Sequence, residues 1–232
     1  SSRNGTRTLL AVGNPRFDRE HWGGLPSLPA AESEVAEVAR LYEHATLLTG
    51  REATKASVLE SARTSGIVHY AGHAVPDDTL FLPRLLLAPD ARTADSGVLD
   101  LRELDGHALP RTRLVVLAAC RTAAGAVSRS EGALSLARPF LAAGVPNVVA
   151  SLWDVDDTLS RKFFVAFHRA LLADGEPLSA LRRVQVAFLR DADPTLAHPA
   201  AWAAFRALGG LDPRALDQRF PSPEDRVAPS VR

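Results

Sequence analysis

Cysteine is almost missing from this chain, which has one, Cys120, in 232 residues. One cysteine cannot build a disulfide framework, and no basic segment followed by an apolar run opens the chain, so we expect a reducing, cytoplasmic environment. Methionine is absent altogether, which predicts a domain taken from a longer chain or a processed product. Only Lys55 and Lys162 are lysines among the 27 basic residues, a skew toward arginine typical of a GC-rich, bacterial genome.

An excess of charge is absent as well, because 27 basic residues face 27 acidic ones. The balance offers no electrostatic reason to expect a nucleic acid or a membrane surface as partner. Every apolar run is shorter than ten residues, too short to span a bilayer. The Gly-x-Ser-x-Gly elbow, the phosphate-binding glycine loop and the dinucleotide fingerprint are missing too, which argues against a serine hydrolase or a nucleotide enzyme.

The sequence that is present alternates apolar, β-branched runs with amphipathic stretches. We predict strands over residues 8–12, 45–48, 67–71, 114–119 and 147–153, and helices over 32–42, 55–62, 133–143, 159–173, 178–189 and 199–208. This alternation predicts one α/β domain over residues 1–211, with a mostly parallel sheet between helices. The run 80–88 contains Pro83 and predicts a hairpin or edge segment outside the central sheet. Residues 212–232, with four prolines, predict an extended or disordered tail.

Two chemically versatile side chains lie where predicted strands end. His73 follows the strand 67–71, and Cys120 follows the strand 114–119. Parallel strands end at the same edge of a sheet, where ligands of open α/β sheets gather. If the two strands are neighbours, the pair forms a thiol nucleophile with its base. Taken singly, each residue also fits a structural role, Cys120 as a small buried apolar residue and His73 as a capping or core histidine.

Metal binding is not expected. His69 lies four residues before His73, a helical spacing for metal ligands, but on a strand four residues span about 13 Å. No second cluster of cysteine and histidine follows, so we expect neither a metal nor another cofactor.

Several motifs together resemble those of the CHAT domain, a family of caspase-like clan CD cysteine peptidases related to separase. They occur in the family's order over about residues 8–210: His69-Tyr70-Ala71-Gly72-His73, the run 114–122 around Cys120, Glu131-Gly132, the segment 142–145, the segment 150–157 and the segment 198–205. Cys120 lies 47 residues after His73, close to the roughly 50 that separate the two catalytic residues in caspases.

The resemblance implies a caspase-like three-layer α/β/α sandwich and peptide hydrolysis. It implies that Cys120 attacks the scissile carbonyl and that His73 is the base. The backbone N–H groups of Ala74 and Cys120 would form the oxyanion hole, although the family commonly has glycine where Ala74 stands. No third member of a triad is identifiable, and a backbone carbonyl could orient His73 instead. The implied partners are a protein substrate and a sensor module, such as tetratricopeptide repeats, in the same or a partner chain.

Three carboxylates follow the strand 147–153, where the family builds the pocket for the residue before the cleaved bond. We expect Asp154 and Asp156 to bind a basic substrate residue, while both also fit a solvated surface. For Asp157 we favour a cap on the helix that starts near Thr158.

Two functions therefore remain open. One is an active cysteine endopeptidase, the effector domain of a sensor-linked protein. The other is a catalytically silent caspase-like interaction or regulatory module. Retention of both His73 and Cys120 favours the peptidase, and Ala74 keeps the alternative open.

Overall fold

A mostly parallel sheet forms the centre of the computed structural model, which describes residues 8–76, 83–106, 109–121, 131–153 and 155–210. Its main path has the order β2-β1-β3-β6-β7-β8. These strands are β1 (Thr8–Pro15), β2 (His44–Gly50), β3 (Ile67–Pro76), β6 (Leu114–Arg121), β7 (Asn147–Ser151) and β8 (Phe205–Gly209). Neighbours on this path are parallel except β8, which runs antiparallel to β7.

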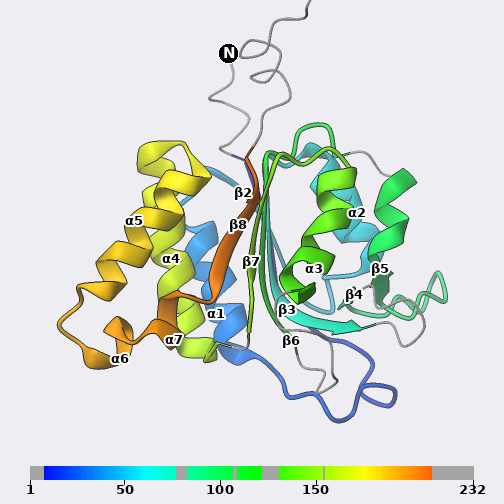
Figure 1. Cartoon of the computed structure of the whole chain (residues 1–232). Coiled ribbons are helices and arrows are strands. Elements are labelled where there is room, and N and C mark those ends of the chain that lie inside the picture. The colour runs from blue at the N-terminus through cyan, green and yellow to red at the C-terminus, as the bar shows by residue number, and fades with distance from the viewer. Residues whose placement is uncertain (1–7, 77–82, 107–108, 122–130, 154, 211–232) are drawn as a thin grey trace, which may run out of the picture.

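Helices cover both faces of the sheet (Figure 1). On one face lie α1 (Pro29–Ala39), α4 (Asp157–Asp174) and α5 (Pro177–Leu189), and on the other lie α2 (Lys55–Thr64) and α3 (Glu131–Ala142). The short helices α6 (Pro194–Ala197) and α7 (Pro199–Trp202) follow α5, and the 3-10 helix η2 (Leu101–Gly106) precedes β6. The predicted three-layer α/β/α class is therefore confirmed.

Alternation along β3 assigns its side chains to two separate cores. Ile67 and Ala71 pack in the cluster beneath α1 and α4, which we call the α1/α4 core. Val68 and Tyr70 pack in the cluster beneath α2 and α3, the α2/α3 core. A strand buried on both faces is mostly apolar, which is why β3 and β6 were predictable as central strands.

The end of the domain differs from the predicted helix over residues 199–208. The helix α7 stops at Trp202, and β8 then places Phe205 in the α1/α4 core. Trp202 and Phe205 are three residues apart, which imitates a helical face. Buried Phe205 is stacked on Phe163 of α4 with ring centroids 4.1 Å apart, and pairing with β7 makes this segment extended. Gly209, at a φ of 95°, ends the strand.

The region after His73 also differs from the prediction. β3 continues to Pro76, and its end pairs antiparallel with β4 (Pro83–Leu86), which in turn pairs with β5 (Val98–Asp100). The predicted hairpin or edge segment is therefore confirmed as antiparallel strands off the main path, but these strands are a branch of the sheet and not a unit outside it. The predicted tail at 212–232 lies outside the described residues.

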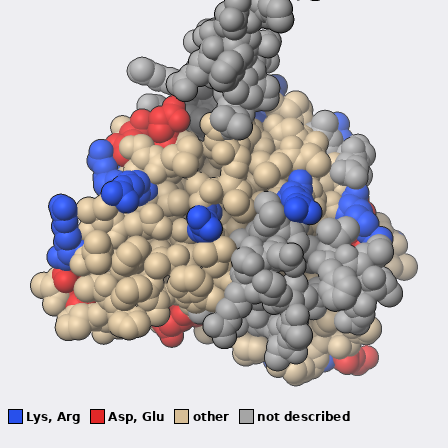
Figure 2. Space-filling model, viewed as in Figure 1, with Lys and Arg blue, Asp and Glu red and all other residues tan. Residues whose placement is uncertain are grey.

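Charged side chains are dispersed on the face seen in Figure 2, where lysine, arginine and acidic residues stand apart among uncharged ones. Among the helices that the structure describes, none combines the length and apolar character needed to cross a bilayer.

We expect Phe205→Ala to lower the free energy of unfolding by about 3 to 5 kcal/mol, because it leaves a cavity against Phe163. Urea unfolding measures the change. Leu189→Ala is the matched control: its side chain is 53% exposed, so a loss of about 0.5 kcal/mol or less is expected. Equal losses in the two variants would contradict the placement of β8.

Candidate active site

The register between β3 and β6 places His73 directly beside Cys120. The two parallel strands pair continuously from Ile67 with Leu114 to Ala74 with Arg121, and His73 is the partner of Cys120. In β6, Leu114 and Val116 belong to the α1/α4 core, and position 120 has the same parity in the strand. The backbone therefore brings the two predicted catalytic positions together at the carboxyl edge of the sheet.

His73 is held by a backbone carbonyl from the loop that precedes α1. Its Nε2 lies 2.8 Å from the carbonyl oxygen of Pro26, and its ring meets that of Phe17 edge-on at 5.2 Å. A carbonyl oxygen can only accept, so Nε2 carries the hydrogen and donates it. In the neutral ring, Nδ1 is therefore the basic nitrogen. Pro26 had no side-chain signal in the sequence that could have identified it.

Burial and the neighbouring polar groups shift the pKa of His73 in opposite directions. Burial, which leaves the side chain 2% exposed, lowers the pKa of His73 below its usual 6.5. The Pro26 carbonyl and the carboxylate of Asp157 act the other way and raise this pKa. Burial is the larger effect, so the neutral ring, the form able to accept a proton, is favoured.

Tyr70 and Gly72 fix the backbone of His73 from the opposite face. The Tyr70 hydroxyl lies 2.8 Å from the carbonyl oxygens of His73 and of Leu86 in β4. A Cβ atom at position 72 would lie 2.6 Å from that hydroxyl oxygen, so only glycine leaves the tyrosine its place. The motif His69-Tyr70-Ala71-Gly72-His73 thus connects the backbone of His73 to β4, the strand that branches from β3.

Ala74 is an ordinary strand residue. It pairs with Arg121 of β6 on one side and with Leu85 of β4 on the other. Among the described non-glycine residues, a positive φ occurs at Asn14 and Ala94 and not at Ala74. Alanine therefore carries no backbone strain here, and the position does not need the glycine that the family commonly has.

Of the three carboxylates after β7, the one that caps α4 is not the one we favoured. Asp156, and not Asp157, caps α4, because its Oδ1 accepts from the N–H groups of Thr158 and Leu159 at 3.0 and 3.1 Å. Asp157 is the first residue of α4, and its Oδ2 accepts from the N–H of Ala30 at 3.1 Å. Asp154 lies outside the described residues.

A chain of buried polar groups, missed in the sequence, surrounds His69. Tyr42 Oη lies 2.7 Å from His168 Nδ1, His168 Nε2 lies 2.9 Å from His69 Nδ1, and His69 Nε2 lies 2.8 Å from Glu34 Oε1. Ser160 donates to the other oxygen of Glu34 at 3.3 Å. This chain joins α1, β3 and α4 within the α1/α4 core. A histidine in the otherwise apolar face of α4 was the signal that could have indicated it.

Burial shifts the titration of two groups in this chain. It raises the pKa of Glu34 above 4.5, and the hydrogen bond from His69 acts the other way. Burial, with the charge of His69, holds the pKa of His168 well below 6.5. His168 is therefore neutral at pH 7 and can bridge Tyr42 and His69.

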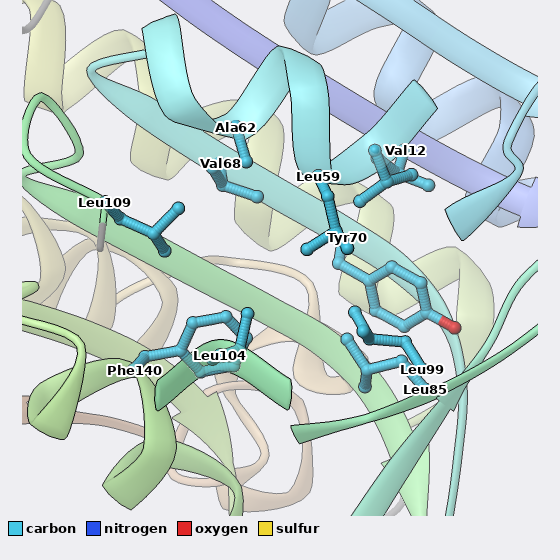
Figure 3. A pocket seen from close by; sticks show the side chains of 11 residues that line it. Val12, Leu59, Ala62, Val68, Tyr70, Leu85, Leu99, Leu104, Leu109 and Phe140 are labelled. Carbon is cyan, nitrogen blue, oxygen red and sulfur yellow. The ribbon is translucent and has the colours of Figure 1, made fainter. Parts of the chain in front are cut away.

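The cavity drawn in Figure 3 lies in the α2/α3 core, and His73 is not among the residues that line it. It has a volume of about 30 Å³ and entirely apolar walls, including Val12, Leu104 and Phe140. Such a space is a packing defect rather than a substrate site. Tyr70 contributes its ring to this wall. Within the described ranges, no group of three or more His, Cys, Asp or Glu side chains is arranged to hold a metal ion.

The fold resembles that of a solved structure. Gingipain R, described as an Arg-specific cysteine proteinase, superposes with a TM-score of 0.54 at 9% identity, covering 89% of this chain and 47% of its own. The Drosophila initiator caspase Dronc matches with a TM-score of 0.43 at 10% identity, covering 79% and 73%. The fold is thus that of the caspase-like cysteine peptidases.

The sequence narrows this class to one family. The model of the CHAT domain matches residues 1–210, and the chain belongs to the CHAT domain family. Tetratricopeptide repeat protein 28 of the mouse, Mus musculus, is 28% identical over 248 residues. That match covers 88% of this chain and 10% of the relative, so the chain spans about a tenth of the relative's length.

We expect His168 to make the protein less stable as the pH drops below 6.5, and His168→Gln to remove this contribution. The pKa of His168 is lower in the folded protein than in the unfolded chain. Below pH 6.5 the unfolded chain therefore binds a proton at His168 that the folded protein does not bind. The free energy of unfolding should therefore fall by up to about 1.4 kcal/mol per pH unit for this group. Glutamine does not titrate and can still bridge Tyr42 and His69.

Urea unfolding at about pH 7.5 and about pH 5.5 measures the difference. His44→Gln, on the exposed part of β2, is the control and should leave the pH dependence as it is in the parent. A pH dependence unchanged in His168→Gln would contradict the expected titration of the buried ring.

Proposed function

We propose that this chain is a cysteine endopeptidase that hydrolyses peptide bonds in protein substrates with His73 and Cys120 as its dyad. The observation that supports this proposal best is the β3–β6 register, which pairs the two positions in neighbouring parallel strands. The hydrogen bond between His73 Nε2 and the Pro26 carbonyl adds to it, because it leaves Nδ1 as the proton acceptor. A backbone carbonyl can thus take the place of the third triad member.

In the proposed reaction the Cys120 thiol transfers its proton to His73 Nδ1, and the sulfur attacks the scissile carbonyl carbon. The backbone N–H groups of Ala74 and Cys120 would stabilise the oxyanion. The imidazolium then gives its proton to the leaving amine, and the C–N bond breaks to leave an acyl-enzyme. Water, deprotonated by His73, hydrolyses the thioester and releases the acid. The negative charge of Asp157 supports the imidazolium form between these steps.

We place this activity in the cytoplasm, within a larger protein whose sensor module controls it. The single cysteine favours a reducing compartment. The relative named for its tetratricopeptide repeats, of which this chain matches about a tenth, supports linkage to such repeats. The Arg121 end of β6 adjoins residues 122–130, which lie outside the described residues.

A second candidate function is a catalytically silent caspase-like interaction or regulatory module. One observation favours it: the side chain of His73 is only 2% exposed. A peptide bond has to reach the base, so a permanently covered His73 could not take part in hydrolysis.

The dyad is tested by Cys120→Ala and His73→Ala. Each should abolish cleavage of a protein or peptide substrate, with a loss of about a thousandfold or more, because nucleophile and base act as one unit. Circular dichroism and urea unfolding check that both variants stay folded. His198→Ala, at the amino end of α7, is the matched histidine control and should keep activity. Turnover that survives Cys120→Ala would rule out the dyad, and a folded parent that never cleaves would favour the silent module.

We further propose cleavage after a basic residue, arginine over lysine, with Asp154 and Asp156 as determinants. A guanidinium matches a carboxylate in charge and in its planar fork of donors, whereas an acidic side chain would be repelled. The Asp156 carboxylate is exposed, and its Oδ1 already accepts two N–H groups of α4, so Oδ2 is the oxygen that would meet the substrate.

A positional peptide library on the parent, Asp154→Asn and Asp156→Asn tests this preference. Asparagine keeps the helix cap at position 156 and removes its charge, so the arginine preference should drop about tenfold without loss of stability. A preference for acidic or large apolar residues would contradict the proposal. So would an arginine preference indifferent to both substitutions.

A further inference from the structure

The helix α1 begins without a cap of its own. Its N-cap residue is Leu28, which has no polar side chain to bind the first N–H groups, and Pro29 follows at the first helical position. The first N–H groups of a helix need acceptors, and serine, threonine or aspartate usually supplies them from the N-cap position. Here the acceptors come from two distant parts of the chain.

The first acceptor is Asn14, at the end of β1. Asn14 Oδ1 accepts from the N–H of Leu28 at 3.0 Å and from Ser27 Oγ at 3.4 Å, while its Nδ2 donates to Glu32 Oε2 at 3.3 Å. The residue lies where the register between β1 and β2 shifts, with a φ of 44°. Asparagine tolerates this left-handed conformation better than most residues. It therefore suits both the backbone at this position and the hydrogen bonds that its side chain makes.

The second acceptor is Asp157, at the start of α4. Because Asp156 caps α4, the Asp157 carboxylate turns to α1 and accepts the N–H of Ala30 at 3.1 Å. Burial raises the pKa of Asp157, the hydrogen bond from Ala30 acts the other way, and the charge of His73 adds to that second effect. The same carboxylate therefore holds α1 and acts electrostatically on the base.

We propose that Asn14 and Asp157 are positioning residues for His73: together they hold the segment 26–31 so that the Pro26 carbonyl stays on His73 Nε2. Pro26 lies two residues before the N–H that Asn14 binds and four before the N–H that Asp157 binds. Loss of either acceptor frees the amino end of α1 and lets this carbonyl move. The importance of this positioning for catalysis rests on the proposed peptidase function. The hydrogen bond between Pro26 and His73 does not depend on that function.

The test uses Asn14→Gly and Asp157→Ala in the whole chain. Glycine keeps the left-handed backbone and removes only the amide, and alanine keeps the helical start of α4. The rescue variant is Asn14→Asp combined with Glu32→Gln, which exchanges donor and acceptor between the two side chains while one oxygen still accepts from Leu28. Asn147→Gly at the amino end of β7 and Asp193→Ala at the start of α6 are the matched controls.

The first readout is the ring N–H of His73 in ¹H–¹⁵N NMR spectra, which needs no turnover. We expect a protected Nε2–H signal in the parent, in both controls and in the rescue variant. In Asn14→Gly and Asp157→Ala its exchange with water should rise at least about tenfold. The second readout is peptide cleavage, where kcat should fall about tenfold to a hundredfold with little change in KM, as expected when a base is misplaced.

Protection that persists in both variants, or is absent from the parent, would overturn the proposal. If Asn14→Gly fails to fold, Asp157→Ala decides alone through the same signal. The parent could cleave no peptide while the variants still lose the protection of the His73 ring N–H. That result would support the positioning role and count against the peptidase function. The two proposals therefore fail separately.

Discussion

The pairing of β3 with β6 is the interaction on which the candidate site depends. Eight consecutive residue pairs, from Ile67 with Leu114 to Ala74 with Arg121, set the relative position of the two strands. A slip by one residue would move every side chain of a strand to the opposite face and exchange the contents of the two cores. Because both faces are buried, such a slip is costly, and the alignment of His73 with Cys120 follows from core packing.

Contacts on both faces of the sheet also hold the strand β3 in place. On one face His69 joins the polar chain of α1 and α4, and His73 meets the loop that carries Pro26. On the other face Tyr70 holds the carbonyl of His73. His73 is thus positioned by side-chain packing, by a hydrogen bond to its ring and by one to its own backbone. Rigid support of this kind is what a catalytic group requires.

Much of this arrangement could be predicted from the sequence, and the exceptions have physical reasons. Continuous apolar runs marked β3 and β6, and the shared edge of parallel strands predicted that His73 and Cys120 would meet. The helix predicted over residues 199–208 was wrong in its second half. The spacing of three between Trp202 and Phe205 is typical of a helix, but pairing with β7 makes the segment from Phe205 a strand. The Pro26 carbonyl could not be predicted, because every residue has a carbonyl and only the folded chain shows which one reaches the ring.

The amino end of α1 is capped by side chains from other parts of the chain. The order in which these parts are synthesised therefore affects when the candidate site is complete. Asn14 leaves the ribosome early, but Asp157 follows only after all of β1, β3, β6 and β7 have been made. A nascent chain that already contains both His73 and Cys120 therefore still lacks one of the two acceptors that secure the loop beside the histidine. The contact between residues 30 and 157 spans most of the domain, and such contacts form late because the chain between them must close first. The first turn of α1, next to His73, is thus secured only after the chain has been made as far as Asp157 and has closed.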